Sequence, residues 1–284
     1  MLPGGGPGGE TGHPGPDAGP SPRVRQAAAA LALLAAEGIR GADPEQWWGL
    51  LPLSTEEPLV DTATSPVPVS PSRVETALQS PLNWFVYQAG GQAGSTQAQS
   101  IGTFIHAIAE AFPRGPAEDL LAELERRLPD LGLEPGWESE RVAREARRML
   151  ELFVGYLRQM EQDGRTVVDV EHRFAQELER GGLRVQIRGS IDRLEQDSQG
   201  RPYVIDLKTG KHAPTAKDLE ELPQLGVYQA AIAAGALPAE DFDRPTEPGG
   251  AALVQLRTAN KNVKIQGQAA LEPDHHWALE QIFT

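Results

Sequence analysis

Residues 183–211 read LRVQIRGSIDRLEQDSQGRPYVIDLKTGK, and this stretch decides the fold. Apolar and polar residues alternate with a period of two on either side of the turn signal Ser198-Gln199-Gly200, as is typical of two strands joined by a hairpin. A third alternating run, TVVDVEHRFAQEL at 166–178, precedes them across the turn signal Gly181-Gly182. The three runs together predict a β-meander.

Helical patterns lie on both sides of this meander. Apolar residues recur at helical spacing, and proline and glycine mark where the helices start and end. The helices expected are a segment that starts at Ser70 or Ser72 and breaks at Pro81, then 102–112, 142–160 and 215–234, with further strands at 251–257 and 263–266. This order predicts an α+β domain in which helices flank a small mixed β-sheet.

Composition divides the chain into three parts. Residues 1–22 are rich in glycine and proline and cannot bury enough apolar surface to order the backbone, which predicts a disordered tail. Residues 23–66 hold an alanine- and leucine-rich helix followed by a proline-punctuated linker, and we interpret them as a helical connector. The folded domain is expected at 67–284.

Cysteine content and apolar run lengths narrow the classes of function. The chain has no cysteine, which excludes disulfides, thiolate zinc sites and cysteine-ligated iron–sulfur clusters. Its longest apolar run, residues 27–36, is far shorter than the roughly 20 residues that span a bilayer, and no signal-peptide core precedes it. These features predict a cytoplasmic protein in which any metal binds through oxygen or imidazole.

Charge is distributed unevenly along the chain. The net charge of −14 argues against a surface that is basic throughout. However, residues 181–217 contain seven Lys/Arg against four Asp/Glu, and residues 251–271 contain three basic residues and no acid. Basic charge therefore gathers in the segments around the meander, where a nucleic-acid phosphate could be bound.

Two carboxylates and a lysine are expected to converge on the meander. Asp192 lies on the polar face of its strand, and Asp206 and Lys208 project from one face of the next strand, about 6 to 7 Å apart. Pairing across the hairpin would bring the three side chains together. Carboxylate oxygens are ligands that Mg²⁺ and Mn²⁺ prefer, and such an ion can activate water beside a phosphate.

The same residues could also have purely structural roles. An Asp-x-Lys pair on a strand is commonly a solvated ion pair worth under about 1 kcal/mol. A lone histidine on a helix, such as His106, is more often structural than a metal ligand. Trp84, Phe85 and Tyr87 could stack on the bases of a single strand, but clustered aromatic residues at helical spacing more often belong to the core.

The order and spacing of four motifs decide between these interpretations. The chain resembles the RecB-type PD-(D/E)XK nucleases of helicase–nuclease enzymes over about residues 67–270, and the resemblance implies a restriction-endonuclease-like core. The family pattern is a helix with Gly-Thr-x-x-His, a strand with Gly-x-Ile-Asp-Arg, a strand with Asp-x-Lys-Thr-Gly and a helix with Gln-x-x-x-Tyr. The matching residues are Gly102, Thr103 and His106, then Asp192, then Asp206 and Lys208, and lastly Gln224 and Tyr228.

The resemblance also implies roles for these residues. His106, Asp192, Asp206 and the Leu207 backbone carbonyl would bind the metal, and Lys208 would be the catalytic lysine. Gln224 and Tyr228 would orient that lysine or the DNA. Basic residues near these motifs would contact DNA phosphates, and we select Arg188, Arg193, Lys211, Lys261 and Lys264.

A metal-dependent DNA nuclease, most simply an exonuclease on single-stranded ends in DNA repair or recombination, is the leading hypothesis. The sequence contains no G-x-x-x-x-G-K-[ST] loop, so the resemblance implies that a UvrD/Rep-like helicase subunit or region would supply ATP-driven unwinding. One alternative is a DNA-binding module that has kept the nuclease fold without activity. Another is a CRISPR-adaptation-type nuclease, which would normally carry cluster-binding cysteines where this chain has Ser80.

Overall fold

The described part of the computed structural model forms two separate units. They are residues 1–59 and 60–284, and each is considered by itself. The structure describes residues 21–47, 57–58, 60–91, 97–258, 261–272 and 277–283.

The N-terminal unit contains helix α1 (Pro22–Ala36) and the short 3-10 helix η1 (Pro44–Gln46). The Ser21 hydroxyl accepts a hydrogen bond from the Val24 N–H and caps α1, which therefore begins close to the expected Arg23. None of the residues of α1 is buried. The predicted disordered tail, 1–22, falls almost wholly on residues outside the described part, so it stays a prediction.

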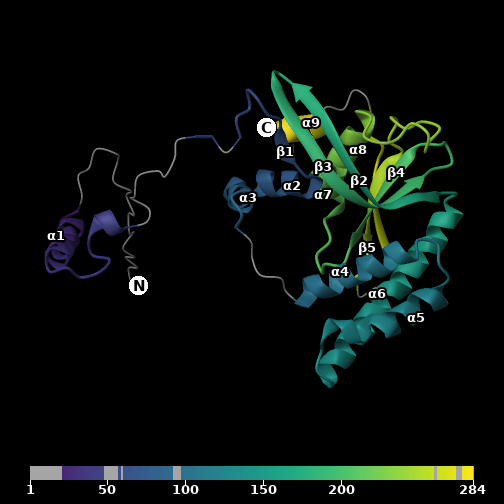
Figure 1. Cartoon of the computed structure of the whole chain (residues 1–284), viewed down its shortest axis with the longest axis horizontal. Coiled ribbons are helices and arrows are strands. Elements are labelled where there is room, and N and C mark those ends of the chain that lie inside the picture. Colours follow the sequence, from purple (N-terminus) through teal and green to yellow (C-terminus); the bar gives the residue numbers. More distant parts are fainter. Residues whose placement is uncertain are drawn as a thin grey trace, which may run out of the picture. The chain divides into compact units, whose positions relative to one another are not determined.

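A six-stranded mixed sheet forms the centre of the second unit (Figure 1). The strand order is β1-β3-β4-β5-β6, and β2 pairs with β3 beside this path. The meander is confirmed, since β2, β3 and β4 pair antiparallel in chain order, whereas β1 runs parallel to β3 and β5 parallel to β4. The strands are β1 (Val67–Val69), β2 (Thr166–Arg180), β3 (Leu183–Gln196), β4 (Pro202–Lys208), β5 (Gly250–Gln255) and β6 (Lys264–Gln268).

Helices cover both faces of the sheet. In Figure 1, α4, α5 and α6 gather on one side, and their apolar residues form one core cluster with Ile205 and Leu207 of β4. On the other face, α2, α7 and α8 form a second cluster with Val204. Because successive residues of a strand point to opposite faces, β4 contributes to both clusters. The helices are α2 (Pro71–Gln79), α3 (Pro81–Gln88), α4 (Gln97–Ala111), α5 (Ala117–Arg127), η3 (Leu128–Leu131), α6 (Trp137–Gln162), α7 (Ala216–Glu220), α8 (Pro223–Ala233) and α9 (Trp277–Phe283).

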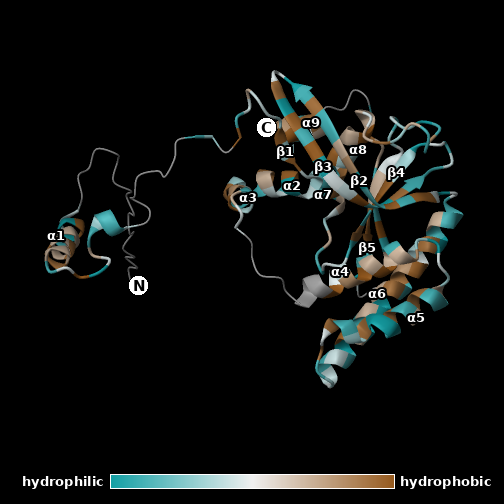
Figure 2. Ribbon diagram, viewed as in Figure 1, coloured by the Kyte–Doolittle hydropathy of each residue, from teal (hydrophilic) through white to brown (hydrophobic). Residues whose placement is uncertain are grey.

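The hydrophobic pattern of the strands follows this layering. Figure 2 shows β2 and β3 with hydrophobic and hydrophilic residues in alternation, as expected for strands with one face less covered. All six residues of β5 are buried, because this strand lies between β4 and β6 with helices over both faces. The observed mixed sheet flanked by helices confirms the fold class expected from the sequence.

Several element boundaries differ from expectation. The helix expected at 215–234 is two helices, because Pro223 begins α8 and its missing N–H cannot continue α7. The start at Ser72 was wrong, since α2 begins at Pro71 after the N-cap Ser70. The sequence patterns did not predict β1, α5 or α9. None of the described helices is long and apolar enough to span a membrane.

Candidate active site

The candidate site lies where the edge of β3 is left without a strand partner. One edge of β3 pairs with β2 over its whole length. The other edge is shared, because 185–187 pair with β1 and 193–196 pair with β4. Within the described part of the chain, residues 188–192 have no strand partner on that second edge. Side chains from β4 and the helices can therefore approach the β3 backbone here.

Two hydrogen bonds fill this gap in the ladder. The Asp192 carboxylate accepts a hydrogen bond from the Leu207 backbone N–H through Oδ2, at 2.7 Å. The Tyr228 hydroxyl donates to the Ser190 carbonyl at 2.9 Å, so α8 is fixed to the open edge of β3. The backbone groups that a neighbouring strand would satisfy are thus bound by site residues instead.

A histidine and two carboxylates form a candidate metal centre. One possible ligand atom from each of His106, Glu171 and Asp192 lies within 4.8 Å of the others. His106 Nδ1 is 3.6 Å from Asp192 Oδ2 and 3.9 Å from Glu171 Oε1. Oxygen and imidazole donors at this spacing suit a divalent cation. The structure thus brings two of the predicted ligands together and adds Glu171.

Glu171 is the site residue that the sequence analysis missed. Its backbone has φ 49°, the only positive value among the described non-glycine residues, and its Oε2 accepts a hydrogen bond from the Ser190 hydroxyl at 3.0 Å. Strain of this kind clusters at functional sites. A signal was present, because the two-residue turn Gly181-Gly182 sets the register in which Glu171 lies opposite Asp192, between the pairs Val170↔Arg193 and His172↔Ile191.

Asp206, Lys208 and Gln224 form a second, connected group. Lys208 Nζ lies 2.7 Å from Asp206 Oδ2 and donates to Gln224 Oε1 at 2.8 Å. The Gln224 amide in turn donates to Asp206 Oδ1 at 2.5 Å. Gln224 therefore holds both partners of the Asp-x-Lys pair, and Asp206 is almost completely buried. This geometry differs from a solvated surface ion pair.

Burial and mutual repulsion perturb the two predicted ligands. Burial raises the pKa of Asp192 well above its ordinary value, and the charge of Asp206 raises it further. Burial lowers the pKa of His106, although the charges of Asp206 and Glu171 oppose this. Several carboxylates thus share one largely buried place beside a neutral imidazole, which is the form that binds metal. A divalent cation would relieve the excess negative charge, so the residues present fit such an ion.

The predicted Leu207 carbonyl has a different contact. The Leu207 backbone lies near enough to His106 to oppose the lowering of the imidazole pKa by burial. The Tyr228 hydroxyl binds the β3 backbone and not Lys208, so of its two expected roles only the one toward DNA stays a prediction. Burial raises the pKa of Tyr228, and the charges of Asp206 and Asp192 add to this effect, so the phenol stays neutral and can donate.

Gly102 allows helix α4 to approach the end of β4. A Cβ at this position would lie 2.6 Å from Thr209 Oγ1, which is closer than real contacts allow. Any side chain here would push α4 away from the strand that carries Asp206 and Lys208. Since His106 lies one turn further along α4, this close packing brings the imidazole to the site.

Arg193 was wrongly selected as a DNA contact. Its side chain is 1% exposed, and its guanidinium binds Glu195 Oε1 at 2.6 Å and the Pro113 carbonyl at 2.7 Å. The Arg193 guanidinium lies 5.9 Å from the centroid of the Tyr156 ring, so α6 covers this side chain. The other four predicted contacts, Arg188, Lys211, Lys261 and Lys264, are exposed.

The aromatic residues of α3 also differ from expectation. Helical spacing favoured a core position for Trp84, Phe85 and Tyr87, but no residue of α3 is buried. Phe85 is 50% exposed and Tyr87 is 44% exposed. An Arg73 guanidinium lies over the Tyr87 ring, 5.7 Å from its centroid.

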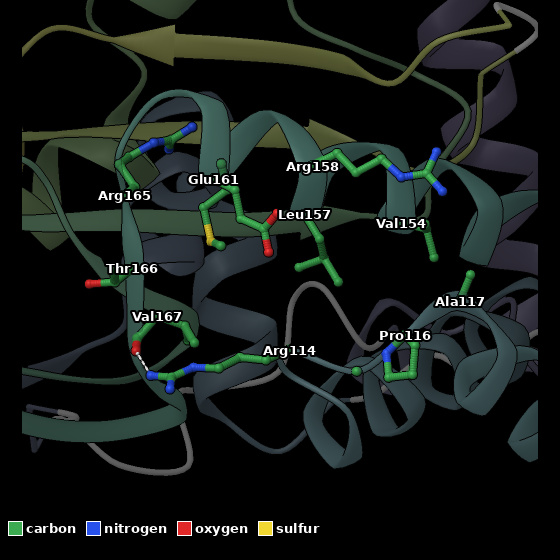
Figure 3. A pocket seen from close by; sticks show the side chains of 12 residues that line it. Arg114, Pro116, Ala117, Val154, Leu157, Arg158, Glu161, Arg165, Thr166 and Val167 are labelled. Atoms are coloured by element: carbon green, nitrogen blue, oxygen red, sulfur yellow. Dashed lines mark hydrogen bonds between the residues drawn. The ribbon is translucent and has the colours of Figure 1, made fainter.

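A cavity of about 630 Å³ beside the C-terminal half of α6 is separate from this site (Figure 3). Arg114, Arg158 and Arg165 line it, and none of the candidate metal ligands is in its lining. Figure 3 shows Arg114 donating to the Val167 carbonyl. Arg165 pairs with Glu195 at 3.3 Å, so this cavity adjoins a structural charge network rather than a metal centre.

Comparison with protein-family models agrees with the geometry. The family model "PD-(D/E)XK nuclease superfamily" matches residues 68–284. A solved structure titled "Crystal structure of SSO0001" is 16% identical, with a TM-score of 0.26 over 64% of this chain and 85% of that chain. No curated protein matches. The family match covers the sheet, its flanking helices and every residue of the candidate site, and the chain therefore belongs to the PD-(D/E)XK nuclease superfamily.

Proposed function

We propose that this chain is a RecB-type, divalent-metal-dependent deoxyribonuclease that hydrolyses phosphodiester bonds at single-stranded DNA ends in the cytoplasm. The observation that carries the proposal is the Asp206–Lys208–Gln224 group beside the His106, Glu171 and Asp192 cluster. An inactive nuclease fold would have no need to keep a buried carboxylate next to a lysine and two further acids. Superfamily membership supports metal-dependent nuclease chemistry in general.

Several candidate ligands together would bind the ion. His106, Glu171 and Asp192 would hold it, with Asp206 and the Leu207 carbonyl as the further ligands implied by the resemblance. A bound Mg²⁺ or Mn²⁺ would lower the pKa of a water molecule and offset charge on the phosphate. Asp192 would have to be ionised to hold the ion, because a carboxylate acts as a ligand in its charged form.

Lys208 would act on the attacking water or on the developing phosphate charge. Asp206 and Gln224 hold its ammonium in one position, which avoids the entropy cost of ordering a long side chain during the reaction. Gln224 is a positioning residue in this scheme, since it contacts both Asp206 and Lys208. Tyr228 supports the site by fixing α8 to the open edge of β3.

The DNA strand and a helicase partner complete the proposal. Arg188, Lys211, Lys261 and Lys264 are exposed cations that could bind phosphates, which would make DNA affinity depend on salt. The chain contains no ATP-binding loop, so a UvrD/Rep-like motor would deliver single-stranded ends during repair or recombination. Tethering to such a motor would raise the local DNA concentration and compensate for the acidic net charge.

Cleavage of labelled DNA tests the proposed function directly. Purified protein is incubated with end-labelled single strands in Mn²⁺, in Mg²⁺ and in EDTA, with duplex DNA and RNA as parallel substrates. We expect cleavage only with metal, and its loss in Asp206→Ala, which removes a carboxylate and leaves the Lys208 charge unpaired. Binding without cleavage under every condition would identify an inactive DNA-binding module instead.

A further inference from the structure

A cavity of about 710 Å³ opens on the same face of the sheet as Lys208. Lys208 and Gln224 lie in its lining, so it is continuous with the candidate active site. Leu78 of helix α2 and Ala213 of the segment before α7 both line it. Its volume lies within the range of 300–1,000 Å³ that is common for pockets that bind small molecules.

The lining of this cavity is mixed in polarity. Apolar surface comes from Leu78 and from Leu253 of β5, and amide groups come from Gln224 and Gln281. The Gln281 Oε1 atom is buried and has no hydrogen-bond partner within the described residues. A buried acceptor of this kind costs free energy until a donor reaches it. The cavity thus offers apolar surface together with a hydrogen-bond acceptor that lacks a donor.

The charges around the cavity disfavour a second phosphate there. Asp206 already pairs with Lys208, which leaves Lys217 as the other lysine in the lining, together with the imidazole of His212. Three carboxylates face them, those of Glu75, Asp218 and Glu221. A group with negative charge would gain little in these surroundings, whereas an uncharged group with donors and apolar faces would fit.

We infer that this cavity binds the nucleoside attached to the phosphate that Lys208 faces. The inference rests on the proposed function, because it takes the phosphate at Lys208 as its starting point. The phosphate would lie at the mouth, next to the metal centre, and the uncharged base would enter between Leu78 and Ala213. A ring N–H or exocyclic amine of the base could donate to Gln281 Oε1. The cavity would then set how tightly a single strand is held, while Lys208 and the metal perform the hydrolysis.

The substitution Leu78→Trp tests the inference by filling the cavity from α2. Leu78 is not one of the candidate metal ligands. We therefore expect the KM for a short single-stranded oligonucleotide to rise about tenfold, the effect of losing the contacts of one base. The kcat should stay within about threefold, and the shift in melting temperature on adding Mn²⁺ should be kept. Leu82→Trp is the matched control, since Leu82 is an exposed leucine on α3 outside this lining.

Oligonucleotide binding without cleavage provides an independent measurement. Fluorescence anisotropy with labelled single-stranded DNA in Ca²⁺ should show weaker binding for Leu78→Trp than for Leu82→Trp. Equal KM values and equal affinities for the two variants would overturn the inference. If Leu78→Trp does not melt cooperatively, Ala213→Trp fills the cavity from another lining position and is judged in the same way.

Failure of the proposed function is visible separately. It would show as a wild-type protein that cleaves no DNA with any metal. In that case the anisotropy measurement still decides the inference: weaker binding by the cavity-filled variant supports a nucleoside site, and equal binding rejects it.

Discussion

Two groups of charged residues lie at neighbouring positions of β3, one half-buried and one buried. Asp192 belongs to the candidate metal centre with His106 and Glu171, where negative charge is in excess. Arg193, the next residue, pairs with Glu195, which also contacts Tyr156 at 2.5 Å and Arg165 at 3.3 Å. In the second group two guanidinium groups face one carboxylate that is completely buried, so charge is paired within the protein.

The difference between these groups separates structural from functional charge. The Arg193 group finds its partners within the fold, and breaking it should cost stability under all conditions. The Asp192 group is incomplete, since burial and neighbouring carboxylates raise the pKa of Asp192. It becomes balanced only with a proton or a cation. Asp192→Asn and Glu195→Gln make the same carboxylate-to-amide change, and they should have opposite consequences.

Glu195→Gln should have the largest effect on stability. It leaves the buried guanidinium groups of Arg193 and Arg165 without their carboxylate, which typically costs about 3–5 kcal/mol. Urea denaturation measures this loss, which should be the same with Mn²⁺ and with EDTA. Asp163→Ala is the control, because Asp163 is the more exposed partner of Arg165 and its loss should cost under about 1 kcal/mol. Equal effects of the two substitutions would show that the buried group is not a stabilising unit.

Lys208→Ala should separate catalysis from metal binding. The rate of DNA cleavage should fall by about 10² to 10⁴, the range for losing a positioned acid–base or electrostatic group. The metal ligands remain, so the increase in melting temperature on adding Mn²⁺ should be largely kept. Single-turnover kinetics measure the first quantity and thermal melting the second. A wild-type cleavage rate would mean that Asp206 and Lys208 form only an ion pair.

Asp192→Asn should abolish stabilisation by metal. For the wild type, an ion at about 100 times its Kd stabilises the folded state by about 2.7 kcal/mol. The amide cannot replace an ionised ligand, so this gain should disappear. In EDTA the variant should be at least as stable as the wild type, because a buried repulsion is removed. Thermal melting with Mn²⁺ and with EDTA checks both statements, and an undiminished Mn²⁺ shift would contradict the site assignment.

A change of pH in the absence of metal should have the smallest effect on stability among these tests. The pKa of Asp192 is raised in the folded state, so its contribution to stability is gained as pH falls through that pKa. The lowered pKa of His106 acts in the opposite direction, and stability is lost as pH falls below 6.5. The difference in melting temperature between wild type and Asp192→Asn isolates the carboxylate.

In EDTA this difference should move in favour of the wild type by a few degrees as pH is lowered, since about 1 kcal/mol shifts the Tm of a domain of this size by roughly 2–4 °C. A difference that does not change with pH would show that Asp192 titrates normally.

The sequence alone determined the elements and the faces of the central strands. Period-two alternation is a local property, so it predicted β2, β3 and β4 and the common face of Asp206 and Lys208. Helix α6 followed in the same way from its apolar spacing. The order of four motifs also identified His106, Asp192 and Gln224 as site residues. The structure places His106 beside Asp192 at the open edge of β3, and Gln224 in contact with Asp206 and Lys208.

Only the tertiary structure decided which charges are buried and what they contact. Arg193 looked like a DNA contact because its neighbours are exposed cations, but helix α6 covers its side of the strand and Glu195 binds it. The short β1 could not be predicted from three residues, yet it shares the edge of β3 with β4 and leaves the gap that holds the site. Glu171 acquires its role from a positive φ and from strand register. These features depend on contacts between residues distant in sequence, which local patterns do not encode.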